Sequence, residues 1–269
     1  MRGSGKAYVY GMLAHPVGHA KSPGMFNEQF EDQGLDSLMV PLTCNPEDFD
    51  KLWDGMTAMS NMRGIIISIP FKVPSLAKAE KAHDRAARVG AANILRRLPS
   101  GGWEADNFDG YGFVLALKAR GYDFAGRKAL QVGAGGAGCS IAFCLAEEGV
   151  AELTLCDVDD ARAADLAQRV QAAFPDCKVT TGSNDPSNHD LIVNATPVGM
   201  KADDPLPVQV ENLEAGSMVV DIIMEPAETR LLAEAKARGC DAQPGRPMMN
   251  HQMQAMSDFL DAERKYENG

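Results

Sequence analysis

The amino-acid sequence predicts an α/β protein with mostly parallel sheets. Short apolar runs that suit buried strands alternate with segments whose apolar residues recur at helical spacing. The run at 64–70 is almost continuously apolar, as expected for a strand that is covered on both faces of a sheet. The β-α-β alternation occurs twice in the 269 residues, with a break near 107–110, so we expect two domains, 1–108 and 109–244.

The first half predicts a mixture of strands, helices and one hairpin. The strands are expected at 8–13, 36–42 and 64–70, and the helices at 24–34, 47–59 and 76–89. Residues 91–98 and 102–106 are expected to form a hairpin, because the Pro-Ser-Gly-Gly run at 99–102 is typical of a turn.

The second half alternates more regularly. Helices are expected at 110–120, 138–148, 161–173, 228–238 and about 247–264, and strands at 128–132, 152–157, 177–181, 190–196 and 217–223. Gly239 is a natural end for the helix at 228–238. We expect the last segment, about 245–269, to pack back on the first domain.

Charge and composition exclude several classes of function. The net charge of −11 repels phosphate backbones and anionic membranes, so we expect neither nucleic acid nor membrane as a partner. We find no apolar run of about 20 residues and no signal peptide at the start, which favours a cytoplasmic enzyme. The six cysteines are scattered, so we expect reduced thiols and no metal site.

A glycine-rich turn at 133–138 fits the pattern G-x-G-x-x-G. It follows an expected strand and begins an expected helix, which is the context in which this pattern binds the pyrophosphate of a dinucleotide. A glycine turn that only packs a helix against a sheet is the alternative.

Asp157 suggests which dinucleotide is bound. It ends the next expected strand, where a carboxylate holds the ribose hydroxyls in NAD sites and repels the extra phosphate of NADP. Asp159 and Asp160 add negative charge, and Arg162 is the nearby cation. We therefore expect NAD, with NADP less favoured, unless Asp157 only caps a loop.

Seven short segments, in order, resemble the shikimate/quinate dehydrogenase family. They are HPVGHAKSP (15–23), SIPFK (68–72), GAANIL (90–95), DNFDG (106–110), GAGGAG (133–138), NATPVGM (194–200) and GRPMMNHQ (245–252). The resemblance implies an N-terminal substrate-binding and catalytic domain and a C-terminal Rossmann-type, doubly wound dinucleotide-binding domain. It also implies reversible hydride transfer at a ring carbinol of a small cyclic hydroxy acid, by a monomer or homodimer.

The same resemblance assigns roles to individual residues. It implies Lys72 and Asp109 as the acid–base pair that moves the hydroxyl proton. The implied substrate-binding residues are Ser22, Ser68, Asn93 and Gln252, and the implied cofactor-binding residues are Gly133, Ala134, Gly135, Gly136, Ala137, Gly138, Asp157, Asn194 and Thr196. Alternatives remain for several: a solvated lysine for Lys72, a helix N-cap for Ser22, a turn cap for Asn93 and a solvated helix face for Gln252.

Four positions depart from the family pattern. Ala20, Ile66, Phe108 and Met224 stand where the family carries hydrogen-bonding side chains. Each buried polar group of a substrate that loses its partner weakens binding by about 1–3 kcal/mol. We therefore expect a divergent dehydrogenase whose best substrate is less polar than shikimate or differently substituted. The alternatives are a dehydrogenase of another cyclic alcohol and a catalytically silent NAD-binding regulatory module.

Overall fold

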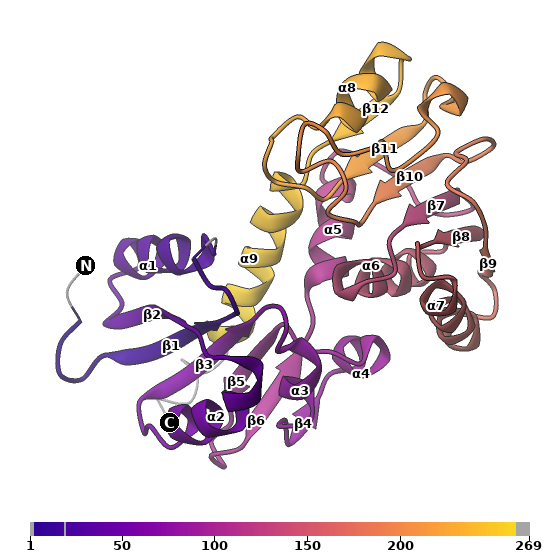
Figure 1. Ribbon diagram of the computed structural model, residues 1–269. Coiled ribbons are helices and arrows are strands. Elements are labelled where there is room, and N and C mark those ends of the chain that lie inside the picture. The colour runs from indigo at the N-terminus through magenta and orange to yellow at the C-terminus, as the bar shows by residue number, and fades with distance from the viewer. Residues whose placement is uncertain (1–2, 19, 262–269) are drawn as a thin grey trace. The chain divides into compact units, whose positions relative to one another are not determined.

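The computed structural model describes residues 3–18 and 20–261 and shows an α/β protein, so the predicted fold class is confirmed (Figure 1). The chain divides into two compact units. The first contains Met1–Phe108 and Met253–Gly269, and the second contains Asp109–Gln252. Each unit has its own sheet and is described separately.

The first unit contains one six-stranded mixed sheet. Its strands are β1 (Tyr8–Leu13), β2 (Ser37–Leu42), β3 (Met62–Ile67), β4 (Lys81–Ala82), β5 (Ile94–Arg97) and β6 (Trp103–Asp106), in the spatial order β2-β1-β3-β5-β6-β4. Strand β1 is parallel to both of its neighbours, whereas β5 runs antiparallel to β3 and β6. The expected hairpin at 91–106 is the β5–β6 pair.

Helices cover both faces of this sheet. Its helices are α1 (Ser22–Asp32), the 3₁₀ turn η1 (Pro46–Asp48), α2 (Phe49–Thr57), α3 (Lys72–Leu76), α4 (Asp84–Val89) and the end of α9 (Arg246–Asp261). Phe49, Trp53 and Met56 of α2 share an apolar cluster with Ile65 and Ile67. On the other face, the Tyr10 ring lies 5.1 Å from the Phe30 ring of α1. This alternation along each strand explains why the runs are apolar throughout.

The expected helix at 76–89 is wrong. That stretch contains the end of α3, strand β4 and helix α4 instead. The Glu80 amide donates to the Trp103 carbonyl at 2.8 Å, and the His83 amide donates to the Ala105 carbonyl at 2.9 Å. Pairing with β6 therefore overrides the helical preference of the intervening residues.

The second unit is a doubly wound sheet of six parallel strands. The strands are β7 (Lys128–Val132), β8 (Glu152–Cys156), β9 (Lys178–Thr181), β10 (Leu191–Asn194), β11 (Met218–Asp221) and β12 (Asp241–Gln243), in the spatial order β12-β11-β10-β7-β8-β9. Counted from β7, this is the order 3-2-1-4-5-6 of dinucleotide-binding folds, which bind ligands where the order reverses. Here that point lies between β7 and β10.

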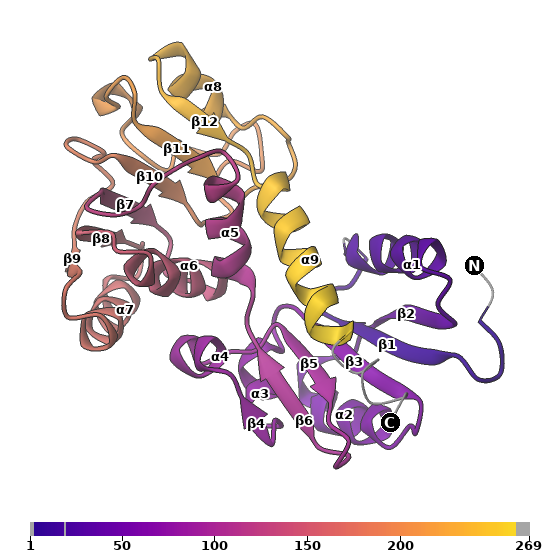
Figure 2. The same ribbon diagram turned by 180° about the vertical axis from the view of Figure 1, so that it is seen from behind.

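Helices flank both faces of this sheet as well. They are α5 (Asp109–Lys118), α6 (Gly136–Glu147), α7 (Asp160–Ala173), the 3₁₀ turn η2 (Val210–Asn212), α8 (Arg230–Ala237) and the start of α9. Leu130 and Val132 of β7 pack in a cluster with Leu231 and Leu232 of α8. Gln131, between them, points the other way and donates to the Gly138 carbonyl of α6. Figure 2 shows the same sheet from behind.

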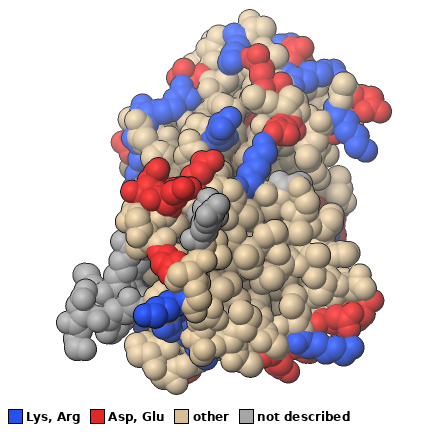
Figure 3. Space-filling view, turned by 90° about the vertical axis from the view of Figure 1, so that its left-hand side faces the viewer, with Lys and Arg blue, Asp and Glu red and all other residues tan. Residues whose placement is uncertain are grey.

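Charged side chains of both signs are interspersed on the face shown in Figure 3, with a broad uncharged area among them. Among the residues that the structure describes, no helix is long and apolar enough to cross a membrane.

Candidate functional site

Two candidate residues of the first unit, Ser68 and Lys72, follow strand β3. The Ser68 amide donates to the Leu13 carbonyl at the end of β1 at 2.8 Å, and the Phe71 amide donates to the Ser68 carbonyl at 2.9 Å. Phe71 is buried, which anchors this turn in the core, and Lys72 begins helix α3. The turn therefore fixes the backbone of both residues at the carboxyl edge of the parallel strands.

Asn93 lies against the same turn. The Ile67 amide donates to the Asn93 carbonyl at 2.8 Å, and the Ala92 amide donates to the Lys72 carbonyl at 2.9 Å. The structure thus brings Ser68, Lys72 and Asn93 together within one unit. The Asn93 Oδ1 accepts the Phe108 amide at 3.0 Å, so this side chain also caps the turn after β6.

Ser22 is the first residue of α1 and is half-buried. The N-cap position of that helix is Lys21, and no side chain caps the helix there. Capping is therefore not the role of the Ser22 hydroxyl. The loop before it begins at His15, whose amide donates to the Ile69 carbonyl at 3.0 Å, so this loop adjoins the Ser68 turn.

Two of the departures from the family pattern are packing residues. Ile66 is 4% exposed in β3 and Phe108 is 5% exposed. The Phe108 ring centroid lies 5.7 Å from the Phe259 ring centroid and 4.8 Å from the Arg85 guanidinium carbon. Ala20, in the loop before α1, and Met224, in the segment after β11 of the second unit, are half-buried.

Asp109 and Gln252 meet in the second unit. Asp109 begins helix α5 and is 5% exposed, and its Oδ1 accepts a hydrogen bond from Gln252 Nε2 at 2.6 Å. Gln252 is 7% exposed on α9, so the alternative of a solvated helix face is excluded. The amide holds one oxygen of the carboxylate in a fixed direction, which is what a group that binds and orients a hydroxyl requires.

The glycine-rich turn at 133–138 connects β7 to α6. Gly133 has φ +106°, and an ideal Cβ on Gly138 would clash with the Gly133 carbonyl oxygen, so both positions require glycine. Gly135 and Gly136 would meet no atom within 4 Å of an added Cβ, so the N-terminus of α6 opens onto free space. Such a cradle fits a pyrophosphate at a helix N-terminus.

Asn194 and Thr196 follow β10, on the other side of the point where the strand order reverses. Asn194 is fully buried, and its Oδ1 accepts the Thr196 amide at 3.1 Å and the Thr196 hydroxyl at 2.7 Å. Its Nδ2 donates to the Val198 carbonyl at 3.1 Å. Asn194 therefore shapes this loop from inside, whereas Thr196 is half-buried within it.

Asp157 directly follows β8, but its carboxylate is already engaged. Oδ2 accepts the Ala134 amide at 2.7 Å, Oδ1 accepts the Asp159 amide at 2.9 Å, and the side chain is 7% exposed. Arg162 lies beside it, with Nη1 3.6 Å from Asp157 Oδ1 and Nη2 3.2 Å from Asp159 Oδ2. The Arg162 side chain is 52% exposed, so a cation is accessible at this edge.

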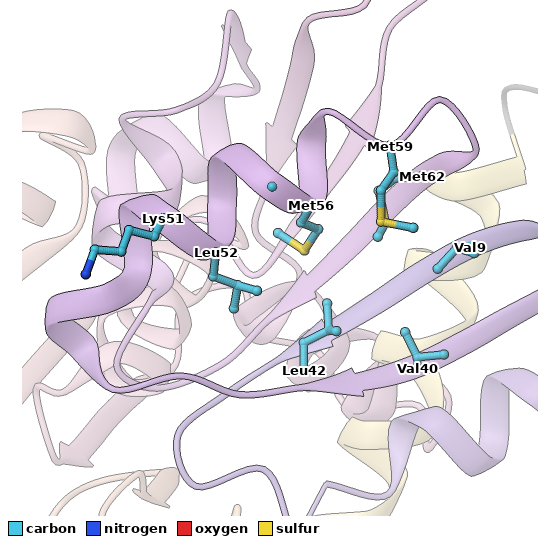
Figure 4. A pocket seen from close by; sticks show the side chains of 9 residues that line it. Val9, Val40, Leu42, Lys51, Leu52, Met56, Met59 and Met62 are labelled. Atoms are coloured by element: carbon cyan, nitrogen blue, oxygen red, sulfur yellow. The ribbon is translucent and has the colours of Figure 1, made fainter.

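The first unit also has a cavity of about 330 Å³ between α2 and strands β1–β3 (Figure 4). Apart from Lys51, its lining residues carry no charge, and they include Val9, Leu52, Met56 and Met62. None of the candidate residues lines it, so it is distinct from the groups assigned to chemistry. Within 3–18 and 20–261, no cluster of three or more His, Cys, Asp or Glu residues could hold a metal ion.

Some residues of the second unit were not found from the sequence. The Ser140 hydroxyl accepts the Gly110 amide at 2.7 Å and so fixes the residue after Asp109. Asp221, which is fully buried at the end of β11, accepts hydrogen bonds from Asn194 and Thr229. An acidic residue that ends an apolar strand was a possible signal for Asp221, whereas Ser140 gave none.

Comparison with known proteins identifies the family. The model of the shikimate dehydrogenase substrate binding domain matches residues 12–95. The shikimate dehydrogenase (NADP(+)) of Acidiphilium cryptum is 36% identical over 93% of this chain and 88% of its own length.

Solved structures share the whole fold. Shikimate 5-dehydrogenase from Listeria monocytogenes, in complex with shikimate and NAD, has TM-score 0.89 and 30% identity over 97% of this chain and 93% of its own. Quinate dehydrogenase from Corynebacterium glutamicum, in complex with NAD, has TM-score 0.88 and 26% identity over 95% and 94%. The 5-ketofructose reductase of Gluconobacter sp. strain CHM43 has TM-score 0.87 and 26% identity over 96% and 94%.

The expectation of NAD as cofactor is wrong, because curated relatives, those of Acidiphilium cryptum and Rhodospirillum rubrum among them, are named for NADP(+). The prediction assumed that the Asp157 carboxylate is free to meet the ribose. The structure instead uses both oxygens for backbone amides, and it places the exposed Arg162 alongside.

These relatives also exclude a regulatory module without activity as the identity of the chain. They are oxidoreductases that act on CH–OH groups with a nicotinamide cofactor, at up to 36% identity over nearly the whole chain. The chain is an enzyme of this type and belongs to the shikimate dehydrogenase family.

Proposed function

We propose that this enzyme transfers a hydride between NADP and a ring carbinol of a shikimate- or quinate-like cyclic hydroxy acid. The first unit is assigned to the substrate, and the second to the cofactor. The observation that carries the proposal is the convergence of Ser68, Lys72 and Asn93 at one turn of the first unit. A hydroxyl, an amino group and a buried amide on neighbouring residues at one edge suit a ligand that carries a carboxylate and several hydroxyls.

Lys72 and Asp109 are assigned to the proton transfer. When a carbinol is oxidised, its hydroxyl proton must leave as the hydride goes to the nicotinamide, and an amine can accept that proton. Asp109 is held by Gln252 at 2.6 Å, so its second oxygen has a defined direction in which to accept a hydrogen bond. Ser22 and Ser68 are assigned to the substrate carboxylate, and Asn93 and Gln252 to ring hydroxyls.

The cofactor is assigned to the cradle at 133–138 and to the loop that contains Thr196. NADP, when bound, supplies the hydride acceptor. The Gly135 and Gly136 backbone at the N-terminus of α6 would face its pyrophosphate, and Arg162 would meet the ribose phosphate, because its guanidinium is the exposed cation beside the end of β8.

The test is NADPH formation at 340 nm with NADP and shikimate or quinate. We expect Lys72→Ala and Asp109→Asn to lower kcat by about 10²–10⁴, the usual loss when a general acid–base group is removed. Lys51→Ala is the matched control, because Lys51 is an exposed lysine on α2 that pairs with Asp48 at 2.8 Å. An unchanged kcat in Lys72→Ala would remove the assigned role.

A less polar cyclic alcohol is the second candidate substrate. Ile66 and Phe108 are buried apolar side chains next to Asn93, because Ile66 pairs with Ile94 and the Phe108 amide donates to Asn93 Oδ1. A protein similar in fold is named a 5-ketofructose reductase, so proteins of this fold also act on substrates other than shikimate and quinate. On this alternative, an analogue of shikimate that lacks one ring hydroxyl has a kcat/KM equal to or above that of shikimate. A loss of about 10-fold or more on removing that hydroxyl would favour shikimate itself.

A further inference from the structure

Asp221 is a fully buried carboxylate at the end of β11. Its Oδ1 accepts the Ile223 amide and the Asn194 side-chain amide, each at 3.1 Å, and its Oδ2 accepts the Thr229 hydroxyl at 2.7 Å. Burial raises the pKa of Asp221, and these hydrogen bonds oppose that effect only in part. Burying a carboxylate costs free energy, and here its hydrogen-bond donors are neutral, so no opposite charge offsets that cost.

These hydrogen bonds connect three separate segments of the second unit. Asn194 and Asp221 are register partners at the ends of the adjacent parallel strands β10 and β11. Ile223 belongs to the segment after β11, and Thr229 is the N-cap of α8, where its hydroxyl accepts the Leu232 amide at 3.4 Å. Asp221 therefore holds the loop after its own strand, the loop after the neighbouring strand and the start of a helix.

The connection continues from Asn194 to the glycine-rich turn. Asn194 binds the Thr196 amide and hydroxyl, and the Ala195 amide donates to the Val132 carbonyl at 2.7 Å. An ideal Cβ on Gly133 would lie 2.8 Å from both the Ala195 carbonyl oxygen and Thr196 Cγ2. The loop after β10 thus packs directly on the first glycine of the cradle, and a shift of that loop displaces the turn.

We infer that Asp221 is a positioning residue for the cofactor site: through Asn194 it holds Ala195 and Thr196 against the Gly133 turn. This inference rests on the proposed binding of NADP at residues 133–138. The carboxylate itself is too deeply buried to meet the cofactor, so its effect passes entirely through the Asn194 amide.

The test is the dissociation constant for NADP, measured by isothermal titration calorimetry on the full-length protein. We expect Asp221→Ala to raise Kd about tenfold, because the Asn194 amide loses an acceptor and the loop loosens. Asp221→Asn keeps an acceptor for Asn194 and Ile223, and should restore Kd to within about threefold of the wild-type value. The KM for NADP should rise in Asp221→Ala, while the KM for the hydroxy acid stays unchanged.

Thr229→Val is the matched control. It removes the hydrogen bond to Asp221 Oδ2 and the α8 cap, so it lowers the urea midpoint of unfolding, but it leaves the hydrogen bonds from Asn194 and Ile223 to Oδ1 intact. We expect its Kd for NADP to be that of the wild type. An equal rise of Kd in Thr229→Val and Asp221→Ala would show general destabilisation and overturn the inference, as would an unchanged Kd in a folded Asp221→Ala.

A second variant protects the test against misfolding. If Asp221→Ala does not fold, Asn194→Ser removes the hydrogen bond to Asp221 together with those to Thr196 and Val198, and should raise the Kd for NADP at least as much. An Asn194→Ser protein with wild-type Kd contradicts the inference. Failure of the wild-type protein to bind NADP at all is a different outcome, which refutes the proposed cofactor site.

Discussion

At the scale of single residues, the charge of the proposed cofactor site depends on the side chains at the end of β8. The Asp157 carboxylate is 7% exposed and engaged by two backbone amides, so its negative charge supports the turn between β7 and α6. The Arg162 guanidinium is 52% exposed on the first turn of α7. Arg162 is thus an exposed cation at this edge, beside the exposed carboxylate of Asp159, and it is the group that a ribose phosphate of NADP could pair with in the proposed site.

This arrangement predicts the effect of removing Arg162. We expect Arg162→Leu to raise the Kd for NADP about tenfold or more, because a hydrogen bond to a charged group contributes about 1.5–3 kcal/mol. Titration calorimetry with NADP measures the change. Arg169→Leu is the control, since Arg169 lies two turns further along α7 and pairs with Asp165 at 3.4 Å. Equal losses in the two variants would mean that only overall charge matters.

The sequence was enough to predict which residue types form the candidate site, but not which atoms they contact. Gly133 and Gly138 could be inferred because a turn between a strand and a helix needs glycine at fixed spacing. The engagement of Asp157 could not, because it depends on where the Ala134 amide points. Asp221 was missed for a related reason: its partner Asn194 is 27 residues away, and only the strand pairing brings them together.

At the scale of elements, the close packing of α5 on α6 depends on one glycine. An ideal Cβ on Gly110 would clash with the Ser140 backbone carbonyl and lie 2.8 Å from Cys144 Sγ. The Gly110 amide donates to the Ser140 hydroxyl at 2.7 Å. Because this contact involves backbone atoms of α6, the two helices must separate to admit a side chain.

We therefore expect Gly110→Ala to lower the free energy of unfolding by about 1–3 kcal/mol, the usual effect of overpacking. Urea unfolding followed by circular dichroism measures it. Gly55→Ala is the control with the same chemical change: Gly55 lies on an exposed part of α2 and its added Cβ meets nothing within 4 Å. That variant should gain up to about 1 kcal/mol from helix propensity. A neutral Gly110→Ala would contradict the packing argument.

Longer elements were more predictable than short ones. Apolar patterns predicted the longer elements α6, α7, β7, β8 and β10. A helix shows such a pattern because it buries one apolar stripe, and a central strand because it buries both of its faces. Strands β4 and β12 have two and three residues and no pattern long enough to detect. Their positions depend on the neighbouring strands β6 and β11, to which they pair.

At the scale of the whole molecule, the first unit joins parts of the chain from both of its ends. Arg96 Nη1 donates to the Phe259 carbonyl of α9 at 2.9 Å, and its guanidinium carbon lies 4.5 Å from the Phe259 ring centroid. Gln29 of α1 donates to the Ser257 hydroxyl at 2.6 Å. The end of α9 thus packs on the first unit through hydrogen bonds to β5 and α1.

Arg96, which contacts Phe259, also pairs with a buried carboxylate. Glu104 of β6 is fully buried, and its two oxygens face three basic side chains. Arg96 Nε lies 2.7 Å from Oε2, whereas Lys81 Nζ and His83 Nε2 lie 2.6 Å and 3.0 Å from Oε1. Burial alone would raise the pKa of Glu104, but the hydrogen bonds from Lys81 and Arg96 outweigh it and lower the pKa below the ordinary value.

This lowered pKa predicts how stability depends on pH. A carboxylate with a depressed pKa in the folded state stabilises the fold above its unfolded pKa, about 4.3 for Glu, and this contribution is lost as pH falls through the folded pKa. We expect Glu104→Gln to have a lower urea midpoint than the wild type at pH 7, and the gap to narrow as pH falls below about 4.3. Glu152→Gln is the control, because Glu152 pairs with Lys128 and Lys178 at the surface and such pairs contribute little. A gap in urea midpoint between wild type and Glu104→Gln that stays constant from pH 7 to pH 3.5 would show that the negative charge of Glu104 does not stabilise the fold.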